Sequence, residues 1–232
     1  MQEKHGENTK IKVASFDFDG VFVLDSDAVF KKEAYEKIFS GYQGRHGAAL
    51  SEAKVLFGSG KPGGRGEVLR YVFRKLGEPE NTLEMRVKKE SLSFDRYVQE
   101  KIASAGLVPG SVEMLNDLSR RGVALYLNSG TATAALSESA LNLGIAGFFK
   151  MILGSTPEPV GGSKAENLRF ILEKEGIGPD GMLFVGDSDY DAEAARECGC
   201  RFLGVSNRWN RWKAGEKPFP LVEDLRDVAR HL

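Results

Sequence analysis

Short apolar runs alternate with amphipathic stretches along most of this 232-residue chain, and this alternation limits the possible folds more than any other feature. Val, Ile, Leu and Phe dominate the runs, which is typical of strands buried on both faces. The expected strands are residues 11–16, 123–127, 151–153, 182–185 and 201–205. Because strands that alternate with helices form crossover units, the sequence predicts an α/β fold with a parallel sheet.

A long helical insert interrupts the alternation directly after the first strand. Between residues 26 and 104 the apolar side chains recur at helical spacing, and no run has the pattern of a strand. We therefore expect a Rossmann-like core made of residues 1–25 and 105–232, with an all-helical cap subdomain of residues 26–104 over the strand ends. The side chains of Asp25, Ser26 and Asp27 are expected to cap the first helix of the insert.

The composition of the chain narrows its functional class. A net charge of −1 argues against a nucleic-acid partner, which needs a strongly basic surface. No apolar run is long enough to span a membrane, and residues 1–10 lack the pattern of a signal peptide. We expect a cytoplasmic protein with no nucleic-acid or membrane partner, whose cysteines, Cys198 and Cys200, stay reduced. The oligomeric state is left open.

Two carboxylates follow the first strand. Asp17 and Asp19 stand two residues apart, with Gly20 next, where the backbone can turn sharply. Ligands of open α/β sheets bind beyond the carboxyl ends of the strands, which is where these side chains should lie. Like charges so close together need a cation or a proton between them, and Mg²⁺ prefers carboxylate oxygens. The alternative interpretation is an ordinary polar turn.

Later strands end in polar groups as well. Ser129 follows the second strand, Asp187 and Asp191 follow the fourth, and Lys164 begins a helix with a capping-box pattern. Each has a structural alternative: Ser129 as a helix cap, Lys164 as a solvated residue of a first turn, and Asp187 as an N-cap. Their placement at successive strand ends favours one shared site.

These residues, in this order, resemble the four motifs of the haloacid dehalogenase superfamily of hydrolases. The motifs are Asp17-Phe-Asp-Gly-Val, Asn128-Ser129-Gly, Lys164, and Gly186-Asp187-Ser-Asp-Tyr-Asp191. With its helical insert, the chain from about Lys10 onward is similar to the phosphoglycolate phosphatase and β-phosphoglucomutase-like branch. The resemblance implies a phosphatase acting on a small phosphorylated metabolite. Dehalogenases of this fold lack an acid at the position of Asp19, because no alkoxide needs a proton in their reaction.

The resemblance also implies roles for the first carboxylates. Asp17 would attack the phosphate monoester and form an aspartyl-phosphate. Asp19 would protonate the leaving alcohol and then activate water. Magnesium would be held by Asp17, the main-chain carbonyl of Asp19, and Asp187.

The remaining motif residues would bind the phosphoryl group. Ser129 and the amide of Gly130 would bind its oxygens, and Lys164 would neutralise its charge. Asp191 would orient Lys164 or a metal-bound water rather than hold the ion itself.

Substrate specificity is expected to come from the cap. In the glycine-rich stretch 58–66, Arg65 is predicted to contact the non-reacting end of the substrate, because Arg binds carboxylates and phosphates in a fork. Lys61, Arg45 and His46 are weaker candidates, and a solvated basic loop is the alternative. The Arg- and Trp-containing segment 206–212 is expected to flank the site or pack on the sheet edge, and residues 221–228 to form a terminal helix.

Two further functions remain open at this point. One is a phosphosugar mutase of the same fold, which would need an activating bisphosphate. The other is a catalytically idle member that binds a partner through its cap. An intact acidic cluster argues against the idle member, because a site without catalysis has no need to hold like charges together.

Overall fold

A six-stranded parallel sheet forms the centre of the protein. The computed structural model describes residues 10–57, 64–155 and 162–232. The strands run in the order β3-β2-β1-β4-β5-β6, and all neighbours pair in parallel. They are β1 (Val13–Phe16), β2 (Ala124–Asn128), β3 (Met151–Leu153), β4 (Met182–Gly186), β5 (Arg201–Val205) and β6 (Leu221–Val222). The predicted Rossmann-like parallel sheet and its five predicted strands are confirmed.

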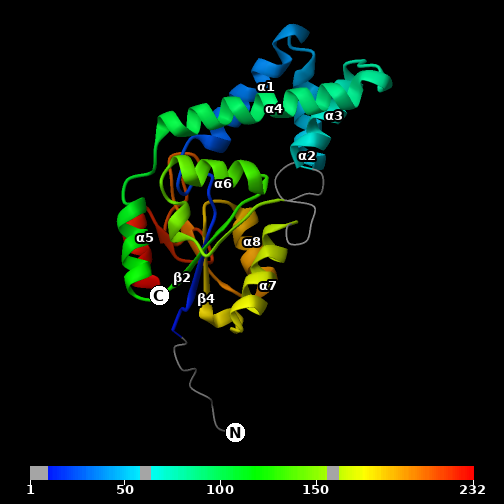
Figure 1. Cartoon of the computed structure of the whole chain (residues 1–232). Coiled ribbons are helices and arrows are strands. Elements are labelled where there is room, and N and C mark those ends of the chain that lie inside the picture. Colours follow the sequence, from blue (N-terminus) through cyan, green and yellow to red (C-terminus); the bar gives the residue numbers. More distant parts are fainter. Residues whose placement is uncertain (1–9, 58–63, 156–161) are drawn as a thin grey trace.

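The insert after β1 is helical in all of its described elements. It contains a π-helical turn η1 (Ser26–Phe30), a 3₁₀ turn η2 (Ser40–Tyr42), and the helices α1 (Lys31–Phe39), α2 (His46–Phe57), α3 (Gly64–Lys75) and α4 (Glu80–Ala105). Figure 1 shows α1 to α4 gathered at one end of the molecule. Aromatic side chains make the centre of this bundle, where the fully buried rings of Phe39 and Phe73 lie 5.3 Å apart. The exact limits of a cap subdomain at residues 26 and 104 stay a prediction.

Helices cover both faces of the sheet. The remaining helices are α5 (Ser111–Arg120), α6 (Thr133–Asn142), α7 (Lys164–Glu175), α8 (Asp189–Cys198) and the 3₁₀ turns η3 (Ala146–Phe148), η4 (Pro179–Gly181) and η5 (Leu225–His231). In Figure 1, α5 lies on one side of the sheet and α7 and α8 on the other. Every residue of β1 and β4 is buried, which explains why these strands are continuously apolar.

The end of the chain differs from the sequence prediction. The apolar spacing predicts one terminal helix over 221–228, but Leu221–Val222 pair with β5 as a sixth strand, and only Leu225–His231 are helical, as a 3₁₀ turn. Main-chain hydrogen bonds from Gly204 to Pro220 (2.9 Å) and from Ser206 to Val222 (2.8 Å) hold this strand. Pairing with a distant strand therefore overrides the local helical spacing.

The expected capping of the insert by Asp25, Ser26 and Asp27 is also wrong. The first turn of the insert has no side-chain cap. Asp25 instead accepts hydrogen bonds from Arg208 and from Trp209 Nε1, and the Ser26 hydroxyl donates to the Val23 carbonyl (3.0 Å). Tertiary partners thus use the Asp25 carboxylate, and a main-chain carbonyl three residues earlier uses the Ser26 hydroxyl.

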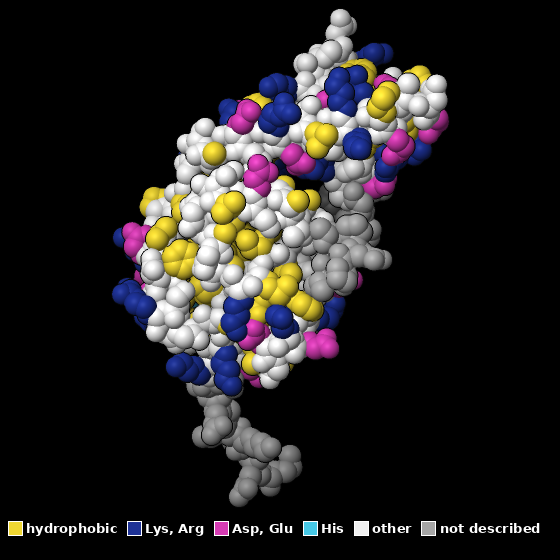
Figure 2. Space-filling view, in the orientation of Figure 1, with side chains coloured by type: hydrophobic (Ala, Val, Ile, Leu, Met, Phe, Trp, Pro, Cys, Tyr) yellow, Lys and Arg dark blue, Asp and Glu magenta, His cyan; other side chains and the backbone are white. Residues whose placement is uncertain are grey.

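The surface and the cysteines agree with the composition. Both cysteines are free thiols. On the face drawn in Figure 2, basic and acidic side chains are interspersed over the helices of the insert. Within the described ranges, no helix combines the length and the apolar character needed to cross a bilayer.

The parallel strands bring distant polar residues to one edge. Asp17 follows β1, Ser129 follows β2, Asp187 follows β4 and Asn207 closely follows β5. Parallel strands end in the same direction, so these residues gather at one edge of the sheet.

Candidate active site

The loop after β1 places two buried carboxylates at the sheet edge. The Asp17 amide continues the sheet by donating to the Val185 carbonyl (2.8 Å), so the backbone of this residue is fixed by β4. Asp17 and Asp19 are only 4% and 6% exposed. Such burial is costly for a carboxylate unless charged partners or hydrogen bonds compensate it. An ordinary solvated turn is therefore excluded.

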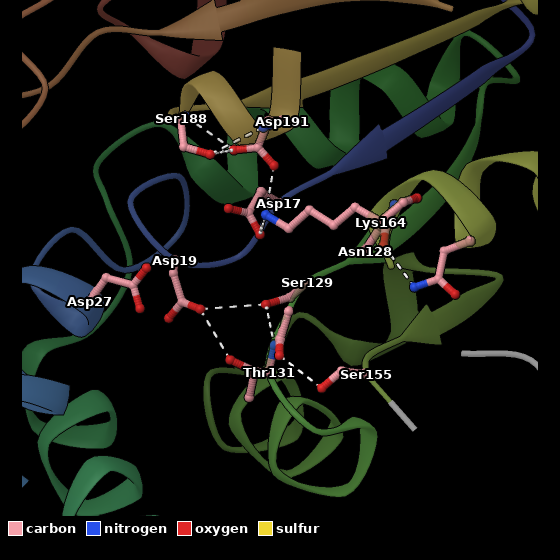
Figure 3. Close-up of polar contacts among 12 residues, drawn as sticks. Asp17, Asp19, Asp27, Asn128, Ser129, Thr131, Ser155, Lys164, Ser188 and Asp191 are labelled. Carbon is pink, nitrogen blue, oxygen red and sulfur yellow. Dashed lines mark hydrogen bonds and ion pairs between the residues drawn. The ribbon is translucent and has the colours of Figure 1, made fainter. Parts of the chain in front are cut away.

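Lys164 joins two parts of the site. Its Nζ lies 2.8 Å from Asp17 Oδ1 and 2.6 Å from Asp191 Oδ1. Figure 3 shows the lysine side chain between these two carboxylates. The residue stands at the first position of α7, where Ser163 and Glu166 form the predicted capping box. With 6% exposure it is a buried residue, so the alternative of a solvated lysine is wrong.

Asp191 holds Lys164 in place. One carboxylate oxygen contacts the ammonium, and the other accepts hydrogen bonds from the amide and the hydroxyl of Ser188. Ser188 is the N-cap of α8, so the alternative of Asp187 as the N-cap is wrong as well. Asp191 and Lys164 are thus in direct contact, and an orienting role of Asp191 stays a prediction.

Asp187 is positioned by residues from the segment after β5. Asn207 Nδ2 donates to Asp187 Oδ2 (2.8 Å) and to the Gly20 carbonyl (3.2 Å), while Asn210 Nδ2 donates to the main-chain carbonyl of Asp187 (2.8 Å). Segment 206–212 thus flanks the site, as expected, and it also packs on the sheet edge through Trp212, whose ring lies 5.4 Å from that of Phe219.

The acidic groups have unusual proton affinities. Burial raises the pKa of Asp17 well above its ordinary value, although the Lys164 ammonium opposes the shift. Burial raises the pKa of Asp187 to about 7, with the Asn207 hydrogen bond acting in the opposite direction. Burial disfavours the charged form of Lys164, but Asp17 and Asp191 together hold its pKa above the ordinary value. The cluster therefore contains too little positive charge for its carboxylates.

A divalent cation fits this cluster. One carboxylate oxygen from each of Asp17, Asp187 and Asp191 lies within 4.8 Å of the other two. Three carboxylates with the single ammonium of Lys164 leave two negative charges uncompensated, which matches the charge of Mg²⁺. Carboxylate oxygens are also the ligands that this hard cation prefers.

The loop after β2 supplies hydroxyl groups. Ser129 Oγ accepts from the Thr131 amide (3.1 Å) and lies 3.4 Å from Asp19 Oδ2, so this serine faces the site rather than capping α6. Gly130 is exposed beside it. Asn128 Nδ2 donates to the Lys164 carbonyl (3.0 Å), which ties the end of β2 to the start of α7.

Three residues of this site were not predicted from the sequence. Lys31 on α1 contacts Asp19, Thr131 contacts the same carboxylate, and Asn207 holds Asp187. A signal existed for Asn207, because it is a polar residue close to the end of a buried strand. Lys31 carries no such signal, since it lies in an amphipathic helix with a carboxylate one turn before it.

The predicted cap residues are less closely connected to the cluster. Arg65 Nη1 lies 2.7 Å from Asp95 Oδ1, and its guanidinium stacks on the Phe94 ring, so its partners here belong to α4. His46 pairs with Glu36, and Arg45 is exposed. Lys61 lies outside the described residues. A substrate contact by Arg65 stays a prediction.

Replacing Gly20 by alanine should disturb Asp187 directly. Gly20 has φ +75°, and a Cβ there would lie 2.0 Å from Asp187 Oδ2. We expect a backbone cost of about 1 kcal/mol and, because the carboxylate must move, roughly 10–100-fold weaker Mg²⁺ binding. Thermal melts and Mg²⁺ titrations measure the two effects.

Gly44→Ala is the matched control for this prediction. Gly44 has φ +80°, but a Cβ there meets nothing within 4 Å. It should share the loss of stability and leave Mg²⁺ binding unchanged. Equal Mg²⁺ affinities of the two variants would contradict the predicted clash.

Comparisons with known proteins find similar chains over part or most of the sequence. A phosphoglycolate phosphatase of Shigella boydii serotype 4 is 32% identical over 139 residues, which are 58% of this chain but only 55% of that protein. One from Vibrio vulnificus is 29% identical over 224 residues, 94% of this chain and 95% of its own length. The crystal structure of a predicted phosphoglycolate phosphatase from Haemophilus somnus has a TM-score of 0.70 at 21% identity, covering 95% of this chain and 97% of that one.

The match to a family model covers most of the chain. The model describes a haloacid dehalogenase-like hydrolase and matches residues 11–199. That range takes in Asp17, Lys164 and Asp191, which the fold brings into contact around one ammonium group. Sequence, fold and site geometry agree, and the chain belongs to the haloacid dehalogenase-like hydrolases.

Proposed function

We propose that the protein is a magnesium-dependent phosphatase that hydrolyses a small phosphate monoester through an aspartyl-phosphate on Asp17. The observation that carries this proposal is the meeting of Asp17, Asp187 and Asp191 with Lys164 at one edge of the sheet. Such a cluster can bind a phosphoryl group and a cation together, and Asp19 is close enough to interact electrostatically with Asp17.

The first half-reaction uses the two carboxylates after β1. A carboxylate oxygen of Asp17 attacks phosphorus, and the bond between phosphorus and the leaving oxygen breaks. Asp19 enters this step protonated, although the effect of burial on its pKa is outweighed by Lys31, which lowers the pKa of Asp19. It gives its proton to the leaving oxygen, so the product leaves with a neutral hydroxyl. Lys164 faces the attacked group and balances negative charge on its oxygens, where a positioned cation contributes most.

The second half-reaction regenerates the enzyme. Asp19, now ionised, takes a proton from water as the water oxygen attacks phosphorus. The bond from phosphorus to Asp17 breaks, and inorganic phosphate is released. Each turnover thus returns the proton to Asp19, and the ester is split by the net addition of water.

Magnesium would be held by Asp17, Asp187 and the main-chain carbonyl of Asp19. When bound, it would supply positive charge to the phosphoryl oxygens. Asn207 orients Asp187 for this role, and Asp191 stays engaged with Lys164. The Ser129 hydroxyl and the exposed amide of Gly130 would bind the remaining phosphoryl oxygens.

Phosphoglycolate is the first substrate to test. The similar proteins named above as phosphoglycolate phosphatases support this choice, and the match to the Shigella protein covers just over half of its length. Arg65 on α3 is the proposed contact for the non-reacting end of the substrate. Breaking its pair with Asp95 would free its guanidinium for a carboxylate.

A panel of phosphorylated metabolites tests the proposal. The purified protein is incubated with each ester, with and without Mg²⁺, and phosphate release is measured, with p-nitrophenyl phosphate as a general probe. We expect release that depends on Mg²⁺ and is fastest with one small ester. No release from any ester in the presence of Mg²⁺ would reject the phosphatase and favour a binding role.

Mg²⁺ binding should weaken as the pH falls below about 7. The pKa of Asp187 is raised to about 7 by burial, so below this pH the carboxyl of the metal-free protein is protonated. A cation must displace that proton, which makes binding roughly tenfold weaker for each pH unit below the pKa. Calorimetry at several pH values, in buffers of different ionisation enthalpy, measures both the affinity and the released proton. An affinity that stays constant through this range would contradict the prediction.

The same shift affects the stability of the metal-free protein. Because the native state favours the protonated form of Asp187, this group costs stability as the pH rises from its ordinary pKa to about 7. Saturating Mg²⁺ should remove that cost. The rise in melting temperature on adding Mg²⁺ should therefore be larger at pH 8 than at pH 6.

A further inference from the structure

A lysine of the helical insert reaches the carboxylate that follows β1. Lys31 stands at the first position of α1, and its Nζ lies 2.7 Å from Asp19 Oδ2 and 3.2 Å from Thr131 Oγ1. It also lies 2.6 Å from Asp27, one turn earlier in the same segment. Lys31 thus connects the insert to two loops at the edge of the sheet.

The two oxygens of the Asp19 carboxylate differ in their surroundings. Oδ2 is close to three donors: Lys31 at 2.7 Å, Thr131 at 3.1 Å and Ser129 at 3.4 Å. Figure 3 shows the Thr131 and Ser129 contacts on the same oxygen. Oδ1 is buried and has no hydrogen-bond partner among the described residues.

This asymmetry orients the carboxyl group. A side chain that is held through one oxygen has its rotamer and its plane fixed, and a buried oxygen without a partner is costly unless a ligand completes it. Proton transfer needs the acid within hydrogen-bond distance of the leaving oxygen. Oδ1 meets this requirement only while Oδ2 stays anchored.

We propose that Lys31 is a positioning residue for the phosphatase reaction, which anchors Asp19 through Oδ2 and leaves Oδ1 free to exchange a proton with the leaving oxygen. The proposal rests on the proposed function. The proton passes from Oδ1 to the leaving oxygen as the bond to phosphorus breaks, and it returns to Oδ1 from the attacking water. Lys31 itself neither gives nor takes a proton.

A simple structural role would have a different consequence. If the ion pair only joins the insert to the core, its loss should slow every substrate by the same factor. If it positions the acid, the loss should depend on how much the leaving group needs a proton. Phenyl phosphate and p-nitrophenyl phosphate are similar in size and charge, but phenolate is much the more basic leaving group.

The test compares kcat/KM for these two esters in wild type and in Lys31→Met, because kcat/KM reports the transfer of the phosphoryl group to Asp17, whereas the later hydrolysis of the aspartyl-phosphate is the same for both esters. We expect kcat/KM for phenyl phosphate to fall about 100-fold, the lower end of the usual contribution of a positioned acid. For p-nitrophenyl phosphate the fall in kcat/KM should be less than about tenfold, because nitrophenolate leaves without a proton. Lys31→Arg should recover part of the loss with phenyl phosphate.

Two further variants test the positioning role even if Lys31→Met does not fold. Thr131→Val removes another donor to Oδ2 while Lys31 stays, and it should shift the ratio of the two kcat/KM values in the same direction by a smaller factor. Lys37→Met changes another lysine of α1, one that lies over the Tyr97 ring, and should leave the ratio unchanged. Thermal melts check that each variant is folded.

The outcomes separate two kinds of failure. If wild type splits neither ester in the presence of Mg²⁺, the proposed function fails, and the positioning role fails with it. If wild type splits both and Lys31→Met slows both equally, or slows neither, only the positioning role is overturned. Should Lys31→Met not fold, an unchanged ratio in Thr131→Val overturns it.

Discussion

Asp17→Asn should abolish phosphate release, with kcat lower by on the order of 10⁴-fold or more, as is usual when a covalent nucleophile is removed. A carboxamide oxygen is a weak nucleophile at phosphorus, and the amide cannot share a cation with Asp187 as a carboxylate can. Phosphate release from the best ester of the panel, followed over long incubations, measures the loss. Asp180→Asn is the matched control, because it makes the same change at an exposed carboxylate outside the site.

Loss of activity in Asp17→Asn should not come from unfolding. Burial raises the pKa of Asp17, so the ionised group costs native-state stability above its ordinary pKa, and a neutral amide avoids that cost. Lys164 keeps Asp191 as its partner. We therefore expect a melting temperature close to that of wild type, with a difference that shifts in favour of the variant as the pH rises. Substantial activity in a folded variant would show that another group is the nucleophile.

Lys164→Met should be the most destabilising single change in the site. It leaves Asp17 and Asp191 buried without the ammonium that lies 2.8 and 2.6 Å from them. Removing one partner of a buried ion pair costs about 3–5 kcal/mol, which is roughly 10 °C in melting temperature for a chain of this size. Phosphatase activity should be lost as well. Chemical denaturation at neutral pH measures the stability.

The pH dependence of stability and two further variants identify the cause of the stability loss in Lys164→Met. At low pH the carboxylates become protonated and need no cation, so the difference between wild type and Lys164→Met should shrink as the pH falls. Adding Asp191→Asn to the variant should restore part of the stability. Lys150→Met removes an exposed partner of Glu175 and should cost less than about 1 kcal/mol. A pH-independent loss would point to packing rather than charge.

The local pattern of the sequence was sufficient to predict the strands at the core of the fold. β1 and β4 are buried along their whole length, so their sequences are continuously apolar and easy to recognise. Once these strands are recognised, the polar residues that follow them can be placed in one cluster, because parallel strands end at one edge of the sheet. Asp17, Lys164 and Asp191 meet there as the order of the motifs implied.

Edge pairing and side-chain partners were not visible in the sequence. Leu221 and Val222 have an apolar spacing that also suits a helix, and only their hydrogen bonds to β5 make them a strand. Asp25 has the chemistry of a helix cap, but Arg208 and Trp209, far along the chain, bind it instead. In both cases a partner distant in sequence outweighs the local preference.

By itself, the sequence determined the α/β fold, the helical insert and the carboxylates and lysine at the strand ends, because burial and backbone geometry leave periodic, local signals. Only the tertiary structure decided that Lys31 of the insert anchors Asp19 and that Asn207 holds Asp187. A lysine in an amphipathic helix has the same local pattern whether it faces water or a buried carboxylate. The contact that distinguishes the two joins separate elements of the fold, and no local sequence pattern encodes it.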